Sequence, residues 1–290
     1  MQIANPIYDS VFKFLMEDTP SAILLLSTII EETIVSLDFL PQENILQLSN
    51  RSLTVYRLDF CAKIKTSQGD KQVLIEIQKA KLPSDIMRFR RYLGVQYSKK
   101  SNRYQMLDSQ NKPHYKSLPI LTIYFLGYPL EHLKAPVIKV KRHYYDAVQN
   151  QEIHTKEDFI ESLTHDSYVI QVSQLQEPCQ SEIEQLLAIF DQHKHLPSDE
   201  HILEIDEKIY PAKYRIIIRR LQQAIAEPEI RKTMDGEDEI LEDLQNMERL
   251  IEEQNRALEQ QNRVLEEKNQ ALEEKDKIIA QLQHLLDKSP

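Results

Sequence analysis

The C-terminal part of the chain carries an apolar residue at every seventh position, and this repeat restricts its fold more than any other feature. The residues are Leu244, Ile251, Leu258, Leu265, Leu272, Ile279 and Leu286. An apolar repeat of seven is typical of a coiled coil, because it keeps one stripe of a helix facing its partner. With these residues at the d positions, Asn255, Asn262 and Asn269 occupy a positions. Asparagines at a pair best in a two-stranded parallel coil, so we predict a parallel homodimer through residues 244–286.

A single solvated helix is the alternative for this stretch. One apolar residue per heptad gives only a thin stripe, and helices rich in Glu, Lys and Gln can stand alone in water. The repeat itself does not separate the two interpretations.

Charge is divided unevenly along the chain. The formal net charge is −10, which taken alone argues against a nucleic-acid partner, since phosphate binding depends on Lys and Arg. Residues 1–145 nevertheless contain 20 Lys or Arg and 13 Asp or Glu, a balance of +7, whereas residues 146–290 contain 16 and 33, a balance of −17. The N-terminal half is therefore compatible with DNA, although the surface lysines of any soluble domain would give a similar count.

Glycine and cysteine exclude several classes of site. The chain has four glycines, Gly69, Gly94, Gly127 and Gly236. Their wide spacing excludes the glycine-rich phosphate loops of nucleotide-binding proteins, so we expect no nucleotide cofactor. Cys61 and Cys179 are 118 positions apart, which is not a metal-type spacing. With no cationic leader and no apolar run long enough to cross a bilayer, we expect a cytoplasmic protein with no membrane partner.

Three regions are expected from the hydrophobic periodicity. Residues 1–175 mix helical and strand periods, residues 176–240 are mainly helical, and residues 241–290 form the coiled-coil stalk. The elements expected in the first region are a helix with Ile7, Val11, Phe12 and Leu15 at helical spacing, a helix from Ser21 to Ile30, a β-hairpin of 53–65 with 71–79, a helix over 84–104, and strands over 118–126 and 168–172. This order predicts the α+β class, a mixed sheet flanked by helices.

The second strand of the hairpin carries polar residues on one face. Strand alternation sends Val73, Ile75 and Ile77 to one side and Leu74, Glu76 and Gln78 to the other. Glu76 therefore belongs to a strongly apolar strand, where a carboxylate is costly unless it faces solvent or is compensated.

A second carboxylate, Asp59, is expected on the same face of the hairpin. A four-residue loop over 67–70 pairs Thr66 with Lys71, and hence Cys61 with Glu76 and Asp59 with Gln78. In this register Asp59 and Glu76 are diagonal neighbours with Cα atoms about 7 to 8 Å apart. Mg²⁺, which binds oxygen ligands and keeps several waters, fits between two such carboxylates. The alternative is that both are ordinary polar positions on a half-exposed sheet, which the spacing alone favours.

The same residues resemble a known family. Asp59, sixteen residues and then Glu76-Ile77-Gln78, preceded by a helix with Asp9-x-x-Phe12-Lys13, are similar to the PD-(D/E)XK nuclease family transposases, also called recombination-promoting nucleases. The resemblance covers roughly residues 5 to 130. It implies a restriction-endonuclease-like fold.

The resemblance also implies roles for individual residues. Asp59 and Glu76 would ligate Mg²⁺ together with the backbone carbonyl of Ile77, and Asp9 would correspond to the acidic residue of the family's first helix. A helix-terminal acid beside the positive end of the helix dipole is an equally good interpretation of Asp9. Gln78 stands where the broad superfamily has Lys, so it can only form hydrogen bonds where Lys would also offset negative charge.

A basic segment after the hairpin is the candidate DNA contact. Arg88, Arg91 and Tyr92 can share one side of the expected helix and fall where the family has a helix with Arg and Tyr. Phosphate binding is the functional interpretation, and a solvated basic helix is the alternative.

We therefore expect a Mg²⁺-dependent DNA endonuclease that hydrolyses phosphodiester bonds in recombination or transposition. Asp59 and Glu76 would hold the metal, Gln78 would position the attacking water, and Arg88 and Arg91 would contact phosphate. The alternative is a catalytically weak or inactive nuclease fold that binds DNA or assembles complexes as a coiled-coil dimer. A third possibility is a coiled-coil adaptor that does not touch DNA.

Overall fold

A six-stranded mixed sheet forms the centre of the first of two units, which spans Met1–Asp238. The structure, a computed structural model, describes residues 1–39, 60–67, 69–79, 85–107, 110–175, 179 and 181–286. Across the sheet the strands are β2 (Ile34–Phe39), β3 (Phe60–Thr66), β4 (Gly69–Gln78), β7 (Ile120–Leu126), β11 (Asp166–Gln171) and β8 (Val137–Val140). The first three are antiparallel, β4, β7 and β11 are parallel to one another, and β8 is antiparallel to β11.

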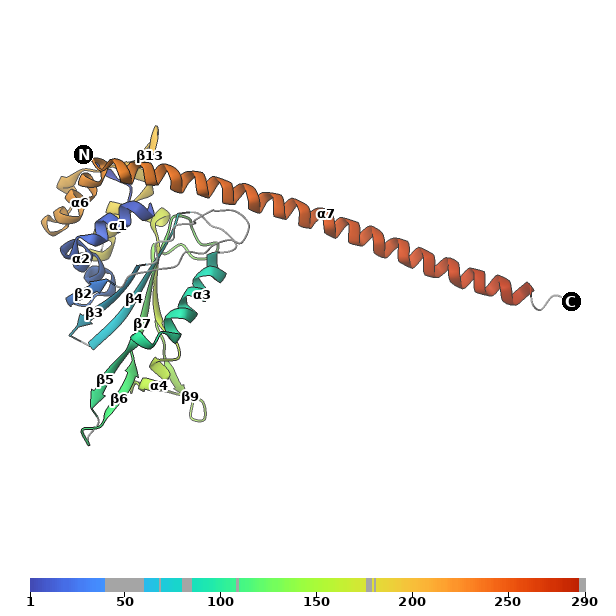
Figure 1. The fold of residues 1–290 in the computed structure, drawn as a ribbon, viewed down its shortest axis with the longest axis horizontal. Helices are drawn as coiled ribbons and strands as arrows, with labels where there is room; N and C mark the ends of the chain where they lie inside the picture. Colours follow the sequence, from blue (N-terminus) through green and yellow to red (C-terminus); the bar gives the residue numbers. More distant parts are fainter. Residues whose placement is uncertain are drawn as a thin grey trace. The chain divides into compact units, whose positions relative to one another are not determined.

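Helices cover both faces of this sheet, and they divide its core in two (Figure 1). The helices of the first unit are α1 (Asp9–Glu17), α2 (Thr19–Ile30), α3 (Asp85–Ser98), α4 (Asp158–Glu161), α5 (Glu182–Leu187) and α6 (Arg215–Ile225), together with the first turns of α7 (Pro228–Leu286). Short 3-10 helices are η1 (Lys100–Asn102), η2 (Val172–Gln174), η3 (Ala188–Phe190), η4 (Gln192–Lys194), η5 (Glu207–Ile209) and η6 (Ala212–Tyr214). The main core lies between the sheet and α1, α2, α5 and α6, and a smaller core lies under α3. The expected mixed sheet flanked by helices is confirmed.

The first two helices form where their apolar residues recur at helical spacing. In α1 the residues Val11, Phe12 and Leu15 are fully buried. The Phe12 ring lies 5.3 Å from the rings of Phe60 in β3 and Phe125 in β7, so α1 is held against the centre of the sheet by aromatic packing.

The β3–β4 hairpin has the expected faces but a different register. Thr66 pairs with Gly69 and Cys61 with Leu74, whereas the expected pairs were Thr66 with Lys71 and Cys61 with Glu76. The turn is tighter because Gly69 has a φ of 122°, a conformation that suits glycine. A shift of two residues returns each side chain to its own face, so Glu76 and Gln78 still share the face of Leu74.

Three smaller sheets have no counterpart among the expected elements. They are the three-stranded sheet of β1 (Gln2–Ala4), β13 (Asp199–Glu204) and β12 (His195–Leu196), the pair β5 (Arg103–Leu107) and β6 (Pro113–Ser117), and the pair β9 (Tyr144–Asp146) and β10 (Gln151–Ile153). The helix expected over 84–104 ends at Ser98, because the chain turns into η1 and β5 there.

The boundary between the units also differs from the expected one. Residues 176–240 were expected as a helical linker, yet β13 pairs with β1, α6 packs on α1, and the first unit continues to Asp238. Pro211 precedes the short helix η6, and Pro228 opens α7.

The second unit, Glu239–Pro290, consists of the remainder of α7 in its described part. A continuous helix over the heptad repeat is therefore confirmed. Leu258, Leu265 and Leu272 are 56–58% exposed in the single chain. Among the described residues, no helix combines the length and hydropathy that a bilayer crossing requires.

One glycine is required where β4 and β7 end side by side. The backbone N–H of Gly127 donates to the Gln78 carbonyl at 2.8 Å, and a Cβ at position 127 would lie 2.3 Å from the carbonyl oxygen of Lys79. Because the obstacle is backbone, a side chain here would force the strand ends apart.

We predict that Gly127→Ala lowers the free energy of unfolding by about 1–3 kcal/mol, the usual cost of overpacking. Urea unfolding followed by tyrosine fluorescence measures it, since the chain has 13 Tyr and no Trp. Gly94→Ala, in α3 with no atom within 4 Å of the added Cβ, is the control and should be neutral or more stable by up to about 1 kcal/mol. Equal stability of the two variants would contradict the close approach.

Candidate functional site

The candidate site lies at the end of β4, a central strand between β3 and β7. Glu76 is 3% exposed and Gln78 is 9% exposed, although both residue types are rarely buried. Glu76 pairs with Tyr124 and Gln78 with Leu126 of the parallel strand β7. Pairing with β7 therefore fixes the backbone of the Glu76-Ile77-Gln78 motif, and the described pairing with β3 ends one residue before it, at Ile75.

Helix α3 covers the sheet face that carries Glu76. Phe89 of α3 packs 4.5 Å from the ring of Tyr124, and the same cluster contains Cys61, Leu74 and Tyr92. Burial raises the pKa of Tyr124 to about 12, against a smaller opposing effect of its hydrogen bond with Thr122. The phenol is therefore neutral at physiological pH, and the residue beside Glu76 on β7 adds no charge to this face.

Gln78 is held by a tyrosine beyond the end of β7. The Tyr128 hydroxyl donates to Gln78 Oε1 at 2.9 Å. The side-chain oxygen is engaged in this way, and the amide Nε2 is the donor that Gln78 can offer to a ligand.

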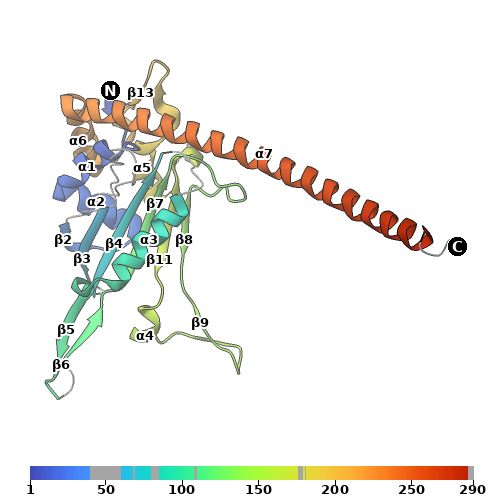
Figure 2. The same ribbon diagram turned by 45° about the vertical axis from the view of Figure 1, so that its right-hand side comes forward.

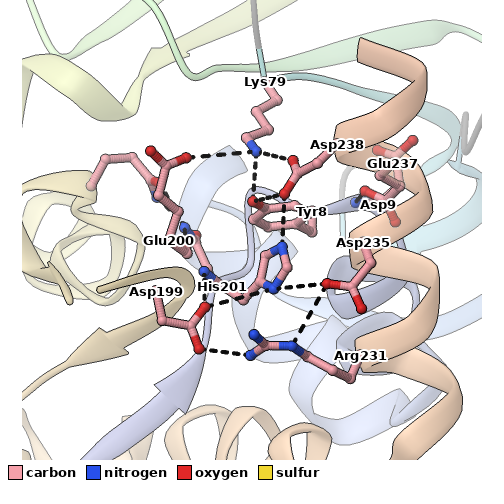
Figure 3. A network of polar contacts seen from close by, with 12 residues as sticks. Tyr8, Asp9, Lys79, Asp199, Glu200, His201, Arg231, Asp235, Glu237 and Asp238 are labelled. Carbon is pink, nitrogen blue, oxygen red and sulfur yellow. Dashed lines mark hydrogen bonds and ion pairs between the residues drawn. The ribbon is translucent and has the colours of Figure 1, made fainter. Parts of the chain in front are cut away.

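Lys79, the next residue, points to the opposite face and enters a polar network, as strand alternation predicts (Figure 3). Its ammonium donates to the Tyr8 hydroxyl at 2.6 Å and forms an ion pair with Asp238 in the first turns of α7. The Tyr8 hydroxyl in turn donates to Asp238 Oδ2 at 3.0 Å. Burial, followed by the charge of Asp238, raises the pKa of Tyr8, which keeps the phenol protonated as a donor.

His201 of β13 completes the network from the other side. Its Nε2 lies 2.7 Å from Asp238 Oδ2, and because a carboxylate only accepts, Nε2 carries the proton. Asp199 and Asp235 lie 3.6 and 3.7 Å from its Nδ1, and Arg231 pairs with Asp199 at 2.7 Å. Burial alone would raise the pKa of Asp238, but the hydrogen bonds from Lys79 and His201 outweigh it and hold the pKa below its ordinary value.

Asp9 lies at the first turn of α1, on the side of this network. The backbone N–H groups of Asp9 and Ser10 donate to the Glu237 carboxylate, each at 2.9 Å, and Figure 3 shows Asp9 beside Glu237. Burial raises the pKa of Glu237, although these hydrogen bonds oppose the shift. A carboxylate from α7 therefore occupies the positive end of α1.

The remaining predicted residues are placed as follows. Asp59 lies outside the described residues, and its neighbour Phe60 pairs with Ile75, the residue before Glu76. Arg88 and Arg91 belong to α3, but their side chains are also outside the described part. Tyr92 is 6% exposed and packs on Phe89 in the core under α3, so little of its ring is open to a DNA strand.

Two of the predicted metal ligands, Glu76 and Ile77, carry donors that suit Mg²⁺. The Glu76 carboxylate and the Ile77 carbonyl offer oxygen, which Mg²⁺ prefers. In the described part of the chain, no three His, Cys, Asp or Glu side chains are grouped so as to hold a metal ion. The predicted site includes Asp59 and remains a prediction.

Several residues of this region could not be found from local sequence patterns. Tyr8 and Asp238 contact Lys79 from segments up to 159 positions away, His201 contacts Asp238, and no local spacing joins these residues. Comparisons with family models, with curated proteins and with solved structures found no match to this chain.

We predict that Asp238→Asn lowers stability at neutral pH by about 1 kcal/mol, a value discounted for the partial exposure of the ion pair. Since the pKa of Asp238 is depressed in the folded chain, its contribution is present above the ordinary carboxyl pKa and is lost as pH falls through the depressed value. Urea unfolding between pH 7 and about pH 2 should therefore show a shallower acid-side loss of stability in the variant. Asp70→Asn, at an exposed residue of β4, is the control, and equal slopes in the two variants would contradict the role of Asp238.

Proposed function

We propose that this chain is a Mg²⁺-dependent DNA endonuclease of the PD-(D/E)XK type, acting in recombination or transposition. The observation that carries the proposal is the nearly complete burial of Glu76 at the end of β4, directly before Ile77 and Gln78. A carboxylate buried in a central strand needs compensation, and a bound Mg²⁺, which prefers oxygen ligands, is one group that can supply it.

The order of elements supports the restriction-endonuclease-like fold that the resemblance implies. Helices α1 and α2 precede the β3–β4 hairpin, α3 follows it, and β7 returns parallel to β4. The motif stands at the carboxyl end of β4, where open sheets with parallel strands commonly bind ligands.

The residues would divide the chemistry as follows. Glu76, Asp59 and the carbonyl of Ile77 would hold Mg²⁺, which supplies a more acidic water and offsets charge on the phosphate. Gln78, oriented by Tyr128, would direct its amide N–H toward the attacking water. Arg88 and Arg91 of α3 would bind the phosphates that flank the scissile bond.

A catalytically silent DNA-binding protein is the second candidate, and one observation favours it. Gln78 is neutral, and the adjacent ammonium of Lys79 is engaged by Asp238 and Tyr8 on the opposite face. The strand therefore provides no cation of its own to stabilise a developing negative charge.

Nicking of supercoiled plasmid in Mg²⁺ tests the nuclease proposal. Glu76→Gln and Asp59→Asn should each lower the nicking rate about 100-fold or more, the effect of losing several kcal/mol of metal-dependent stabilisation. Glu131→Gln, at an exposed residue of the first unit, removes the same charge and should nick normally.

Nicking that persists in both site variants would refute the assigned roles. Absence of nicking by the wild type in Mg²⁺, Mn²⁺ and Co²⁺, combined with DNA binding without metal, would support the silent candidate. Failure to bind any duplex would reject both and leave the coiled-coil adaptor.

We also propose that residues 244–286 form a parallel homodimeric coiled coil, which would supply two active sites for cleavage of both strands. The half-exposed Leu258, Leu265 and Leu272 would then be covered by a second chain. Sedimentation at micromolar concentration should show a dimer for the wild type and a monomer for Leu258→Glu/Leu265→Glu. Gln260→Glu/Gln270→Glu adds the same charge outside the a and d positions and should stay dimeric; a monomeric wild type would contradict the proposal.

A further inference from the structure

The positive charge of the N-terminal half is concentrated in one segment. Residues 85–117 contain 8 Lys or Arg and 2 Asp or Glu, so this stretch accounts for +6 of the +7 balance over residues 1–145. It comprises α3, η1 and the hairpin of β5 and β6. Positive charge that is concentrated in one segment indicates a local binding surface, because the surface cations of an ordinary soluble domain are spread over the whole domain.

The β5–β6 hairpin projects from the body of the first unit. It forms a two-stranded sheet with no further strand among the described residues. Helix α3 returns the chain from the carboxyl end of β4, and the hairpin extends beyond the end of the sheet at which β4 and β7 begin (Figures 1 and 2).

One face of the hairpin is anchored and the other is open. Lys116 forms an ion pair with Asp158 of α4. The opposite face, by strand alternation, carries Arg103 and Gln105 of β5 and Tyr115 of β6, where Gln105 and Tyr115 are direct partners. All three are exposed, and Tyr115 reaches 68%.

The cations at the base of the hairpin differ from several others of the unit, which are held in ion pairs. Ion pairs to nearby carboxylates neutralise Lys71, Lys79, Lys116, Lys139, Arg142, Lys213 and Arg231. Lys99, Lys100 and Arg103 are exposed and form no ion pair with any residue of the described ranges. Three unneutralised charges within five residues repel one another, and a polyanion would remove that cost.

The shape and position of the hairpin suit duplex DNA. The major groove of B-DNA admits a two-stranded β-ribbon. Gln72 of β4 pairs with the first residue of β7. Glu76 lies four residues further along β4, which is about 13 Å from Gln72. The strands of the hairpin, five residues each, extend about 17 Å in the other direction. The far ends of the two strands, at Leu107 and Pro113, therefore lie on the order of 30 Å from Glu76, close to the length of one helical turn of B-DNA, about 34 Å.

We propose that the β5–β6 hairpin lies in the major groove of DNA about one helical turn from the scissile bond. Lys99, Lys100 and Arg103 bind phosphates there, and Gln105 and Tyr115 face the groove. This inference rests on the proposed function, because it takes DNA as the ligand and Glu76 as the mark of the cleavage point.

Fluorescence anisotropy with a labelled duplex about four helical turns long tests the inference in EDTA, which prevents metal-dependent cleavage. Lys99→Gln/Lys100→Gln/Arg103→Gln should weaken binding about tenfold or more and reduce the slope of log K against log salt by about two to three. Tyr115→Ala should weaken binding without changing that slope.

The control Lys208→Gln/Arg219→Gln/Lys232→Gln removes three exposed charges from other elements of the first unit. It should leave the slope unchanged. Equal loss in the two triple variants would overturn the inference, because net charge would then explain the binding. If the hairpin triple variant binds DNA as tightly as the wild type and the protein still nicks plasmid, the inference is overturned and the proposed function stands. A wild type that binds no duplex would overturn both.

Two further readouts locate the contact. Hydroxyl-radical footprinting should show a protected patch about ten base pairs from the nick, and the hairpin triple variant should lose that patch alone. Double-stranded RNA, whose major groove is too narrow for side chains to read, should bind more weakly, and equal affinity with the same dependence on the hairpin would overturn insertion into the groove.

Discussion

The burial of strand β4 on both faces is the constraint on which the rest of the first unit depends. A strand covered by helices on both sides needs apolar residues throughout. Val73 and Ile75 meet the core under α1 and α2, and Leu74 meets the core under α3. Gln72 departs from this rule with a hydrogen bond to Gln96 of α3, and the strand departs from it again toward its end, at Glu76 and Gln78. Local departures from otherwise consistent folding signals are expected at functional positions, and this one lies where two parallel strands end beside each other.

The network around Lys79 shows how the end of β4 is held in place. Tyr8 precedes α1, His201 belongs to β13 and Asp238 belongs to α7, yet all three surround one ammonium or its partner carboxylate. Sites supported by packed elements and satisfied hydrogen bonds keep their geometry better than sites on free loops. Lys79, the residue after the Glu-x-Gln motif, is therefore anchored by the beginning and the end of the first unit.

Much of the sheet was predictable because periodicity is a local signal. Residues 11–15 and 73–77 reveal their buried faces by spacing alone, and the heptad repeat predicts a continuous helix. The register of the hairpin was not predictable, since it depended on whether Gly69 lies in the turn or in the strand. Strands such as β1 and β13 are short and pair across about 200 residues, so the long-range contact that creates them leaves no local pattern. For the site, spacing placed Glu76 and Gln78 on one face, but the burial of Tyr92 and the partner of Gln78, Tyr128, required the tertiary structure.

The tight turn between β3 and β4 favours changes in the length of this hairpin by an even number of residues. Cys61 and Leu74 face each other under α3, and period-two alternation carries that face on to Glu76. Adding or removing two residues at the turn keeps the acidic side chain under α3. A change of one residue would instead exchange Glu76 with Ile77, placing a carboxylate in the aromatic core around Phe12. Chains descended from a common hairpin of this type should therefore differ in loop length by even steps, or carry a β-bulge that absorbs the odd residue.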